Sequence, residues 1–221
     1  MLYGILKPLA VLVMRLWFRL EVRGTEHVPA AGPVLLVANH SSLLDPPLVG
    51  GAAPRRLCFM AKAELFRVPL FGRLIRALNA RPVRREGAGA QALREALDAL
   101  RSGQALLVFP EGTRGDEGDI RPAKPGAGML AVMSGATVVP VYVSGSGRAL
   151  PRGRLVPRPA KVVVRFGPAL SFTVAPDDAR RERYREAAEE MMRAVARLRD
   201  AAVRAPGAAA TPAHMQDRIS G

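Results

Sequence analysis

The chain has 221 residues, of which 49% are apolar, and its 33 Lys and Arg outnumber 19 Asp and Glu. This length and apolar content suit one globular domain with a full core, and the formal net charge of +14 indicates an anionic partner: a nucleic acid, a membrane surface or an acidic substrate. Aromatic residues are only 5% and no basic patch is interleaved with stacking side chains, which argues against nucleic acid. The single cysteine, Cys58, excludes an intrachain disulfide and a multi-cysteine metal site, and its apolar neighbours predict a buried strand residue.

The first 20 residues are rich in leucine, valine and aromatic side chains but include Lys7, Arg15 and Arg19. The longest uncharged run, Pro8 to Met14, is much shorter than the roughly 20 residues that span a bilayer. On a helix, the three basic residues fall within a third of the circumference and the leucines mostly elsewhere. The pattern predicts an amphipathic helix lying at a membrane interface. The alternative is a helix that simply packs on the core.

A short strand is predicted over residues 21–24 and a buried strand over 33–38, which leads into Asn39-His40-Ser41-Ser42-Leu43-Leu44-Asp45-Pro46. His40 is therefore expected in a strand-to-helix loop at the carboxyl end of a strand, where α/β folds place their chemistry. Asp45 can turn back onto Nδ1 of His40 and leave Nε2 free as a base that activates a substrate hydroxyl. The alternative is that Asp45 only caps the next helix and His40 is an ordinary loop histidine.

A strand is predicted over residues 55–62 and a helix over 63–79, despite Pro69. Between Arg55 and Arg85, nine residues are basic and one, Glu64, is acidic. Charges that flank exposed apolar side chains suit anionic lipid headgroups, whereas a solvated basic face is the usual alternative. The apolar side chains expected to be exposed on this helix are Leu65, Phe66, Leu70 and Phe71.

A second motif, Phe109-Pro110-Glu111-Gly112-Thr113-Arg114, also follows an apolar strand, predicted over residues 105–108. An amphipathic helix over 91–102, ended by Gly103, precedes that strand. The acidic segment 115–119 that follows the motif is predicted to be an exposed polar loop and not a metal site, because no histidine supports it.

The last third of the chain continues the alternation of strands and helices. A short helix is predicted over residues 129–134, and a strand over 137–143 whose Pro140 indicates an edge or a bulge. An exposed basic loop from residue 148 leads into an alternating strand over 161–166. A long helix over 177–203 carries an apolar stripe typical of core packing. This element order favours a single α/β domain, followed by an Ala-, Pro- and Gly-rich tail over 204–221 that is predicted to be disordered.

The His40 and Glu111 motifs, in combination, resemble those of the phospholipid-type glycerolipid acyltransferases, and among these most closely the bacterial 1-acylglycerol-3-phosphate acyltransferases. Two weaker blocks, residues 80–85 and 138–142, fall in the order that the family has, and the resemblance covers about residues 20–170. It implies the glycerol-3-phosphate acyltransferase fold, a mixed central sheet flanked by helices, over residues 21–203. The membrane-associating segment, 1–20, precedes this domain.

The resemblance also implies the roles of individual residues. His40 and Asp45 are the catalytic pair, and Arg85 and Arg114 contact the acceptor phosphate, although Arg81 and Arg84 replace an apolar and an acidic residue of the family pattern. Glu111 orients Arg114 or bonds the acceptor's glycerol, or only caps its turn. Lys124 faces the phosphate or is a surface lysine, and Pro140 lines the acyl-donor pocket. The implied substrate-binding set is Arg85, Glu111, Gly112, Thr113, Arg114, Lys124 and Pro140; no metal or redox cofactor is implied.

The expected reaction moves a fatty acyl group from an acyl thioester, either acyl-CoA or acyl-carrier protein, to lysophosphatidate and makes phosphatidic acid. The enzyme is expected at the cell membrane, peripheral or monotopic on the cytoplasmic face. One alternative is another lysolipid acceptor, against which the arginines that suit a phosphate argue. The other is a non-catalytic membrane-surface binding protein, against which the His40–Asp45 pair argues.

Overall fold

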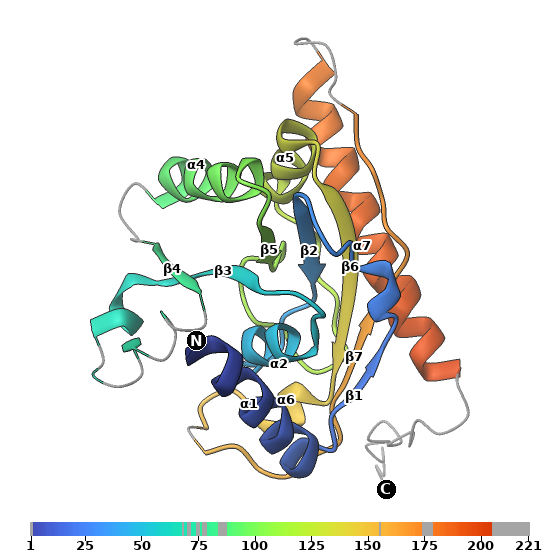
Figure 1. Cartoon of the computed structure of the whole chain (residues 1–221). Coiled ribbons are helices and arrows are strands. Elements are labelled where there is room, and N and C mark those ends of the chain that lie inside the picture. The colour runs from blue at the N-terminus through green and yellow to red at the C-terminus, as the bar shows by residue number, and fades with distance from the viewer. Residues whose placement is uncertain are drawn as a thin grey trace, which may run out of the picture.

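The computed structural model describes residues 2–67, 69, 72, 73, 76, 79–83, 88–154, 156–173 and 179–204. In this part of the chain a seven-stranded sheet has the order β1-β7-β6-β2-β5-β3-β4 (Figure 1). The strands are β1 Glu21–Arg23, β2 Val34–Ala38, β3 Leu57–Lys62, β4 Ala80–Val83, β5 Ala105–Val108, β6 Thr137–Ser144 and β7 Val163–Phe166. The helices are α1 Leu2–Phe18, α2 Asp45–Ala52, α4 Ala88–Arg101, α5 Pro125–Ser134, α6 Ser146–Ala149 and α7 Arg180–Arg204, with 3-10 helices η1 Thr25–His27 and η2 Ala63–Arg67.

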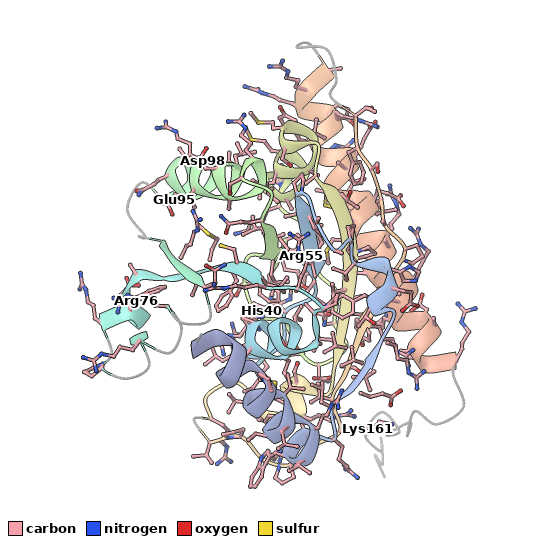
Figure 2. All side chains as sticks on the ribbon, viewed as in Figure 1. His40, Arg55, Arg76, Glu95, Asp98 and Lys161 are labelled. Atoms are coloured by element: carbon pink, nitrogen blue, oxygen red, sulfur yellow. The ribbon has the colours of Figure 1, made fainter. Side chains whose placement is uncertain are left out.

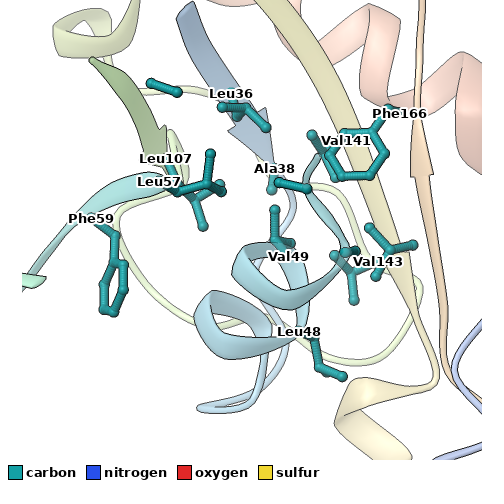
Figure 3. Close-up of a cluster of buried hydrophobic side chains, with 14 of the residues drawn as sticks. Leu36, Ala38, Leu48, Val49, Leu57, Phe59, Leu107, Val141, Val143 and Phe166 are labelled. Carbon is teal, nitrogen blue, oxygen red and sulfur yellow. The ribbon is translucent and has the colours of Figure 1, made fainter. Parts of the chain in front are cut away.

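The sheet is mixed, as predicted, because β6 and β7 pair antiparallel while the other neighbouring strands pair parallel. Helices cover both faces: α1 and α2 lie on one, and α4, α5 and α7 on the other (Figure 1). Alternate residues of β2 therefore enter two different cores. Leu36 and Ala38 pack with α2 (Figure 3), whereas Leu35 and Val37 face α5 and α7. A strand buried on both faces reads as a continuous apolar run, which is what residues 34–38 are.

The Arg55 guanidinium lies at the end of the sheet opposite to His40, before β2 and β5 begin. It donates hydrogen bonds to the carbonyls of Pro29, Gly32 and Gly103 over 2.9–3.1 Å. These carbonyls belong to the turns before β2 and before β5. Because it joins three backbone carbonyls, Arg55 has a structural role.

The helix predicted over residues 63–79 is not continuous: residues 63–67 form a 3-10 helix, and residues 72, 73 and 76 are α-helical. The chain forms the 3-10 helix η2 and then turns at Pro69, which lacks the N–H that a continuing helix needs. It folds back so closely that a Cβ on Gly72 would lie 2.4 Å from the Phe66 carbonyl oxygen. That oxygen accepts a hydrogen bond from Arg76, whose guanidinium also lies 5.3 Å from the Phe66 ring centroid. Phe66 is buried and not exposed as predicted; the side chains of Leu65, Leu70 and Phe71 lie outside the described residues.

Most other predicted elements are confirmed, with shifts at their ends. Pro125 begins α5 four residues before the predicted start, since proline suits the first helical turn. The stripe on α7 is core packing, as predicted, with Met191 and Val195 fully buried. Asp177, Asp178 and the tail 205–221 lie outside the described residues.

Helix α1 is present where the amphipathic segment was predicted, and it packs on α2. A Cβ on Gly51 of α2 would lie 3.1 Å from Sδ of Met14, so the two helices are in close contact. Phe18 at the end of α1 is buried, and its carbonyl accepts the N–H of Val162 at 2.9 Å. Within the described residues, no helix combines the length and apolar character that crossing a membrane requires.

Candidate active site

The two sequence motifs meet because their strands are parallel neighbours. Val37 of β2 pairs with Val108 of β5, so both strands end at the same edge of the sheet. The chain after β2 forms the His40 loop, residues 39–45, and the chain after β5 forms the Glu111 loop, residues 111–119. The carbonyl of His40 accepts the N–H of Gly115 at 2.7 Å, which joins the loops directly.

Buried polar side chains fix the His40 loop to the neighbouring strand β6. The side-chain amide of Asn39 donates to the carbonyl of Val143 at 3.0 Å and accepts its N–H at 2.8 Å, which extends the β2–β6 pairing beyond the strand. The hydroxyl groups of Ser41 and Ser146 lie 3.0 Å apart, and Ser42 donates to the carbonyl of Leu150 at 3.0 Å. Asn39 and both loop serines are buried. The loop is therefore held by three side chains that point into the protein, on either side of His40 in the sequence.

One oxygen of the Asp45 carboxylate organises the loop. Oδ2 accepts three hydrogen bonds of 2.8 Å, from Nδ1 of His40 and from the N–H groups of Ser41 and Ser42. Asp45 is fully buried and lies within the first turn of α2, whose N-cap is Leu44. The carboxylate thus turns back to the loop, and the alternative that Asp45 merely caps the helix is wrong. Its other oxygen, Oδ1, is buried and has no partner among the described residues.

The imidazole of His40 is presented at the site edge, beside α2 (Figure 2). Its ring stacks on Phe109, with centroids 4.1 Å apart and an angle of 23° between the planes. Its side chain is 18% exposed. Because an ionised Asp45 accepts at Nδ1, that nitrogen carries the proton and Nε2 has the free lone pair of a base.

Glu111 contacts the His40 loop and forms no ion pair with Arg114 among the described residues. Its Oε1 accepts the backbone N–H of His40 at 3.1 Å, whereas Oε2 is buried without a partner among the described residues. Glu111 is 4% exposed, and this burial, with a smaller contribution from the nearby Asp119 and Asp45 charges, raises the pKa of its carboxyl to about 7. The group therefore titrates near neutral pH.

The tip of the Glu111 loop, Gly112–Arg114, points outward. Gly112 has φ 69°, and a Cβ there would lie 2.7 Å from Nζ of Lys124. Gly112, Thr113 and Lys124 are exposed, and Arg114 is half-buried. Within the described part of the chain neither Arg114 nor Lys124 has an ion pair. The structure thus brings a free guanidinium and an ammonium to the loop that adjoins His40.

Two of the predicted substrate-binding residues are not placed beside His40. Arg85 lies outside the described residues. Pro140 is buried in β6, an interior strand, with its ring near Gly167 and α7. Beyond the β6–β7 ladder, Val138 bridges Leu170 with one extra residue in the later segment, and this bulge accommodates the proline. The role of Pro140 in a donor pocket stays a prediction.

Sequence reasoning missed several residues that shape the site. Asn39 and Phe109 belong to the motifs but were given no role. Glu117 was predicted to be an exposed acid, yet its carboxylate accepts the N–H groups of Gly145 and Gly147, the latter at 2.7 Å. No local pattern links residue 117 to residues 145–147, so only the fold reveals this contact. No group of three or more His, Cys, Asp or Glu is arranged for a metal within the described residues.

The chemistry available at this edge is that of a base without a protein nucleophile. His40 and Asp45 have the geometry of the base and the orienting acid of a catalytic triad, whereas Ser41 and Ser42 turn their hydroxyls into the protein. A hydroxyl on a bound molecule would suit such a base as nucleophile. Arg114 and Lys124 offer donors to an anionic group on that molecule.

The chain matches known proteins over most of this domain. A family model described as acyltransferase matches residues 19–144. A 1-acyl-sn-glycerol-3-phosphate acyltransferase of Bacillus subtilis is 34% identical over 133 residues, which cover 59% of this chain and 66% of that protein. A chloroplastic enzyme of the same name from Brassica napus is 29% identical over 140 residues, 62% of this chain and 40% of that protein. The match therefore spans less than half of the Brassica napus protein.

A solved structure has the same fold. The crystal structure of the 1-acyl-sn-glycerophosphate (LPA) acyltransferase PlsC from Thermotoga maritima superposes with a TM-score of 0.68 at 30% sequence identity. The superposition covers 86% of this chain and 80% of that chain. The predicted fold class, a mixed sheet flanked by helices, is confirmed.

Proposed function

Because this chain belongs to the acyltransferase family, we propose that it moves a fatty acyl group from an acyl thioester to the free hydroxyl of 1-acylglycerol-3-phosphate, making phosphatidic acid. The observation that carries this proposal is the 2.8 Å hydrogen bond between His40 Nδ1 and Asp45 Oδ2. It leaves Nε2 as a base on a loop that Gly115 joins to the loop carrying Arg114, which has no ion pair among the described residues. The relatives named for this reaction support the choice of substrate.

In the proposed reaction, Nε2 of His40 takes the proton of the acceptor hydroxyl while the hydroxyl oxygen attacks the thioester carbonyl. The tetrahedral intermediate collapses, the carbon–sulfur bond breaks, and the imidazolium returns the proton to the leaving sulfur. The products are an ester and a free thiol. Asp45 keeps the proton on Nδ1 and stabilises the imidazolium as it forms; positioned base catalysis of this kind contributes roughly 10²–10⁴-fold.

The acceptor phosphate is proposed to bind at Arg114, with Lys124 beside it. Guanidinium matches a phosphate with a planar, bidentate fork, and the half-buried position of Arg114 reduces competition from water. Thr113 is exposed at the same tip. Another lysolipid acceptor fits this tip less well unless it also carries an anionic headgroup.

The donor class follows from the chemistry of the leaving group, since a thiolate leaves more readily than an alkoxide. Both acyl-CoA and acyl-carrier protein present the same thioester, so either is a chemically competent co-substrate. The acid–base pair needs no metal or redox cofactor for this transfer. The steps rest on proton movement at His40 and on orientation of two substrates.

The proposed test is an acyl transfer assay with purified protein. Lysophosphatidate, lysophosphatidylcholine, lysophosphatidylethanolamine and a lyso-aminolipid are each paired with acyl-CoA and acyl-carrier protein. We expect lysophosphatidate to give the highest kcat/KM. A higher value with an uncharged or zwitterionic headgroup would overturn the assignment of the acceptor, and absence of transfer with every pair would overturn the reaction.

The protein is also proposed to bind the cytoplasmic membrane surface through α1. Four large apolar side chains on α1, Leu12, Val13, Leu16 and Trp17, are between 49% and 74% exposed. They lie on the side of the helix opposite to Met14 and Phe18, which pack inward. Arg15 and Arg19 are exposed beside them and suit anionic headgroups.

A matched pair of variants tests the membrane proposal. Leu16→Ser removes an exposed apolar side chain from α1, whereas Val203→Ser removes a comparably exposed one from the end of α7, with exposures of 74% and 73%. We expect Leu16→Ser to weaken binding to anionic vesicles about tenfold, since burying a leucine is worth up to roughly 1.5–3 kcal/mol, and Val203→Ser to leave it unchanged. Equal binding of both variants would contradict the proposal. Substitution is preferred to deletion because Phe18 and Leu20 are core residues.

A further inference from the structure

Glu117 is attached to the turn that begins helix α6. One carboxylate oxygen accepts the N–H of Gly145, and the other accepts the N–H of Gly147 at 2.7 Å. Bonds to an ionised acceptor are stronger than neutral ones. A single side chain from the Glu111 loop thus fixes two backbone groups that lie about thirty residues further along the chain.

The same turn contacts the catalytic pair from its other side. Ser146, fully buried between the two glycines, places its hydroxyl 3.0 Å from that of Ser41. The N–H of Ser41 in turn donates to Oδ2 of Asp45 at 2.8 Å. The contacts therefore run without a gap from Glu117, through the turn and Ser41, to the carboxylate that orients His40.

The backbone of this turn has little space to move. Gly145 has φ 87°, and a Cβ there would lie 2.0 Å from the carbonyl oxygen of Lys161. A Cβ on Gly147 would lie 2.6 Å from Glu117 Oε2 and 3.4 Å from Cβ of Ser41. The turn is thus enclosed between Glu117 and the His40 loop, so a shift at Glu117 reaches Ser41 directly.

We propose that Glu117 is a positioning residue for acyl transfer. It fixes the position of the His40–Asp45 pair relative to the tip that carries Arg114. This inference rests on the proposed function. Glu117 lies three residues after Arg114, and the intervening Gly115 donates to the His40 carbonyl at 2.7 Å. Glu117 therefore sets the position of the base relative to the bound acceptor without touching either substrate.

The first test compares Glu117→Gln with Asp116→Asn. Both remove one negative charge from the same loop, but Asp116 is exposed and its side chain has no hydrogen bond or ion pair with another described residue. We expect Glu117→Gln to lower kcat about tenfold, because small misplacements of catalytic groups reduce rates strongly, with both KM values within about twofold of wild type. Asp116→Asn should match wild type. Equal kcat for Glu117→Gln and wild type would overturn the proposal.

A double-mutant cycle with Ser146→Ala separates positioning from a general loss of structure. Ser146→Ala cuts the contact with Ser41, so Glu117→Gln should reduce kcat much less in that background than in wild type. If the kcat losses of the two single variants multiplied in full in the double variant, transmission through the turn would be contradicted.

Hydrogen exchange tests the same link without any activity. In Glu117→Gln the peptide that covers residues 39–45 should exchange faster than in wild type and in Asp116→Asn, because Ser41 and Ser42 N–H bonds to Asp45 are loosened. Unchanged exchange would overturn the inference, whichever reaction the protein catalyses. Absence of transfer by wild type, with faster exchange in the variant, would instead refute only the proposed function.

Discussion

The His40 loop and the tip of the Glu111 loop, Gly112–Arg114, lie side by side but are built in opposite ways. In the His40 loop the polar side chains of Asn39, Ser41, Ser42 and Asp45 are buried and hydrogen-bonded. At the tip, Gly112 and Thr113 are exposed, and Arg114 has no ion pair within the described residues. The polar side chains of the His40 loop bond within the protein, whereas the tip offers a guanidinium that a substrate can bind.

This difference fits two separate requirements of the proposed reaction. A general base is effective only when its ring and tautomer are fixed before the substrate arrives, because reorganisation would add to the barrier. A phosphate-binding arginine needs the reverse, since an internal carboxylate would compete with the ligand. The protein therefore fixes the position of the base with its own atoms and leaves the cation free for the substrate.

The largest effect is expected from His40→Ala. Removing the base should lower kcat by roughly 10²–10⁴-fold, while the loop keeps the Asp45 bonds to the Ser41 and Ser42 N–H groups. Steady-state kinetics and a thermal unfolding curve measure the two effects. An alanine variant with near wild-type turnover would break the assignment of His40 as the base.

Asp45→Asn tests whether the fixed tautomer matters. The amide oxygen can still accept the three donors that meet at Oδ2, but the amide carries no negative charge to keep the proton on Nδ1 and to stabilise the imidazolium. We expect a loss in kcat on the order of 10²-fold with a small residual rate, since His40 is still present. The dissociation constant of the acceptor, measured directly in a binding assay, should change little. Loss of acceptor affinity with kcat retained would place Asp45 in substrate binding instead.

Arg114→Ala tests the open half of the comparison. Loss of a bidentate, charge-assisted contact to the acceptor phosphate should lower kcat/KM for the acceptor on the order of 10²-fold, with the donor KM little changed. Arg121→Ala is the control. It also removes a cation from this region, but Arg121 is already paired with Asp119 at 3.2 Å. If only the donor parameters moved, Arg114 would belong to the thioester site.

The sequence predicted the parts of the site that depend on local order. His40 follows β2 and Glu111 follows β5, and the sequence placed each motif directly after an apolar strand. The parallel pairing of these strands then brings both motifs to one edge of the sheet. The H-x4-D spacing allowed the His40–Asp45 contact, and the family resemblance favoured it over a simple helix cap. The prediction of a helix over residues 63–79 gave more weight to the helical spacing of apolar residues than to Pro69. The chain turns at this proline, so the helix is not continuous.

Contacts between distant segments were not predictable in this way. Asn39 bonds Val143 and Ser41 bonds Ser146, each more than a hundred residues away. The partner of Glu111 also came from the fold, since a glutamate beside an arginine suggests a local ion pair, yet Glu111 Oε1 accepts the N–H of His40. Side-chain-to-backbone bonds of this kind leave no periodicity in a sequence.

The smallest expected effect tests Glu111, the buried residue that joins the two loops. Its carboxyl has a pKa of about 7, mainly because of burial, against 4.5 in a solvated carboxyl. The folded protein therefore holds this proton between about pH 4.5 and 7 while the unfolded chain releases it. The contribution to stability is fully present below the lower value and is lost as pH rises through about 7.

Glu111→Gln mimics the protonated carboxyl and does not titrate. It retains an oxygen that can accept the His40 N–H, so near pH 5 its thermal unfolding midpoint should be close to that of wild type. As pH rises to 8, wild type should lose stability relative to Glu111→Gln, by several degrees, since 1 kcal/mol shifts the midpoint of a protein of this size by about 2–4 °C. Midpoints measured from pH 5 to 8 test this. A constant difference across that range would show that Glu111 does not titrate there and that burial is offset by a partner of Oε2.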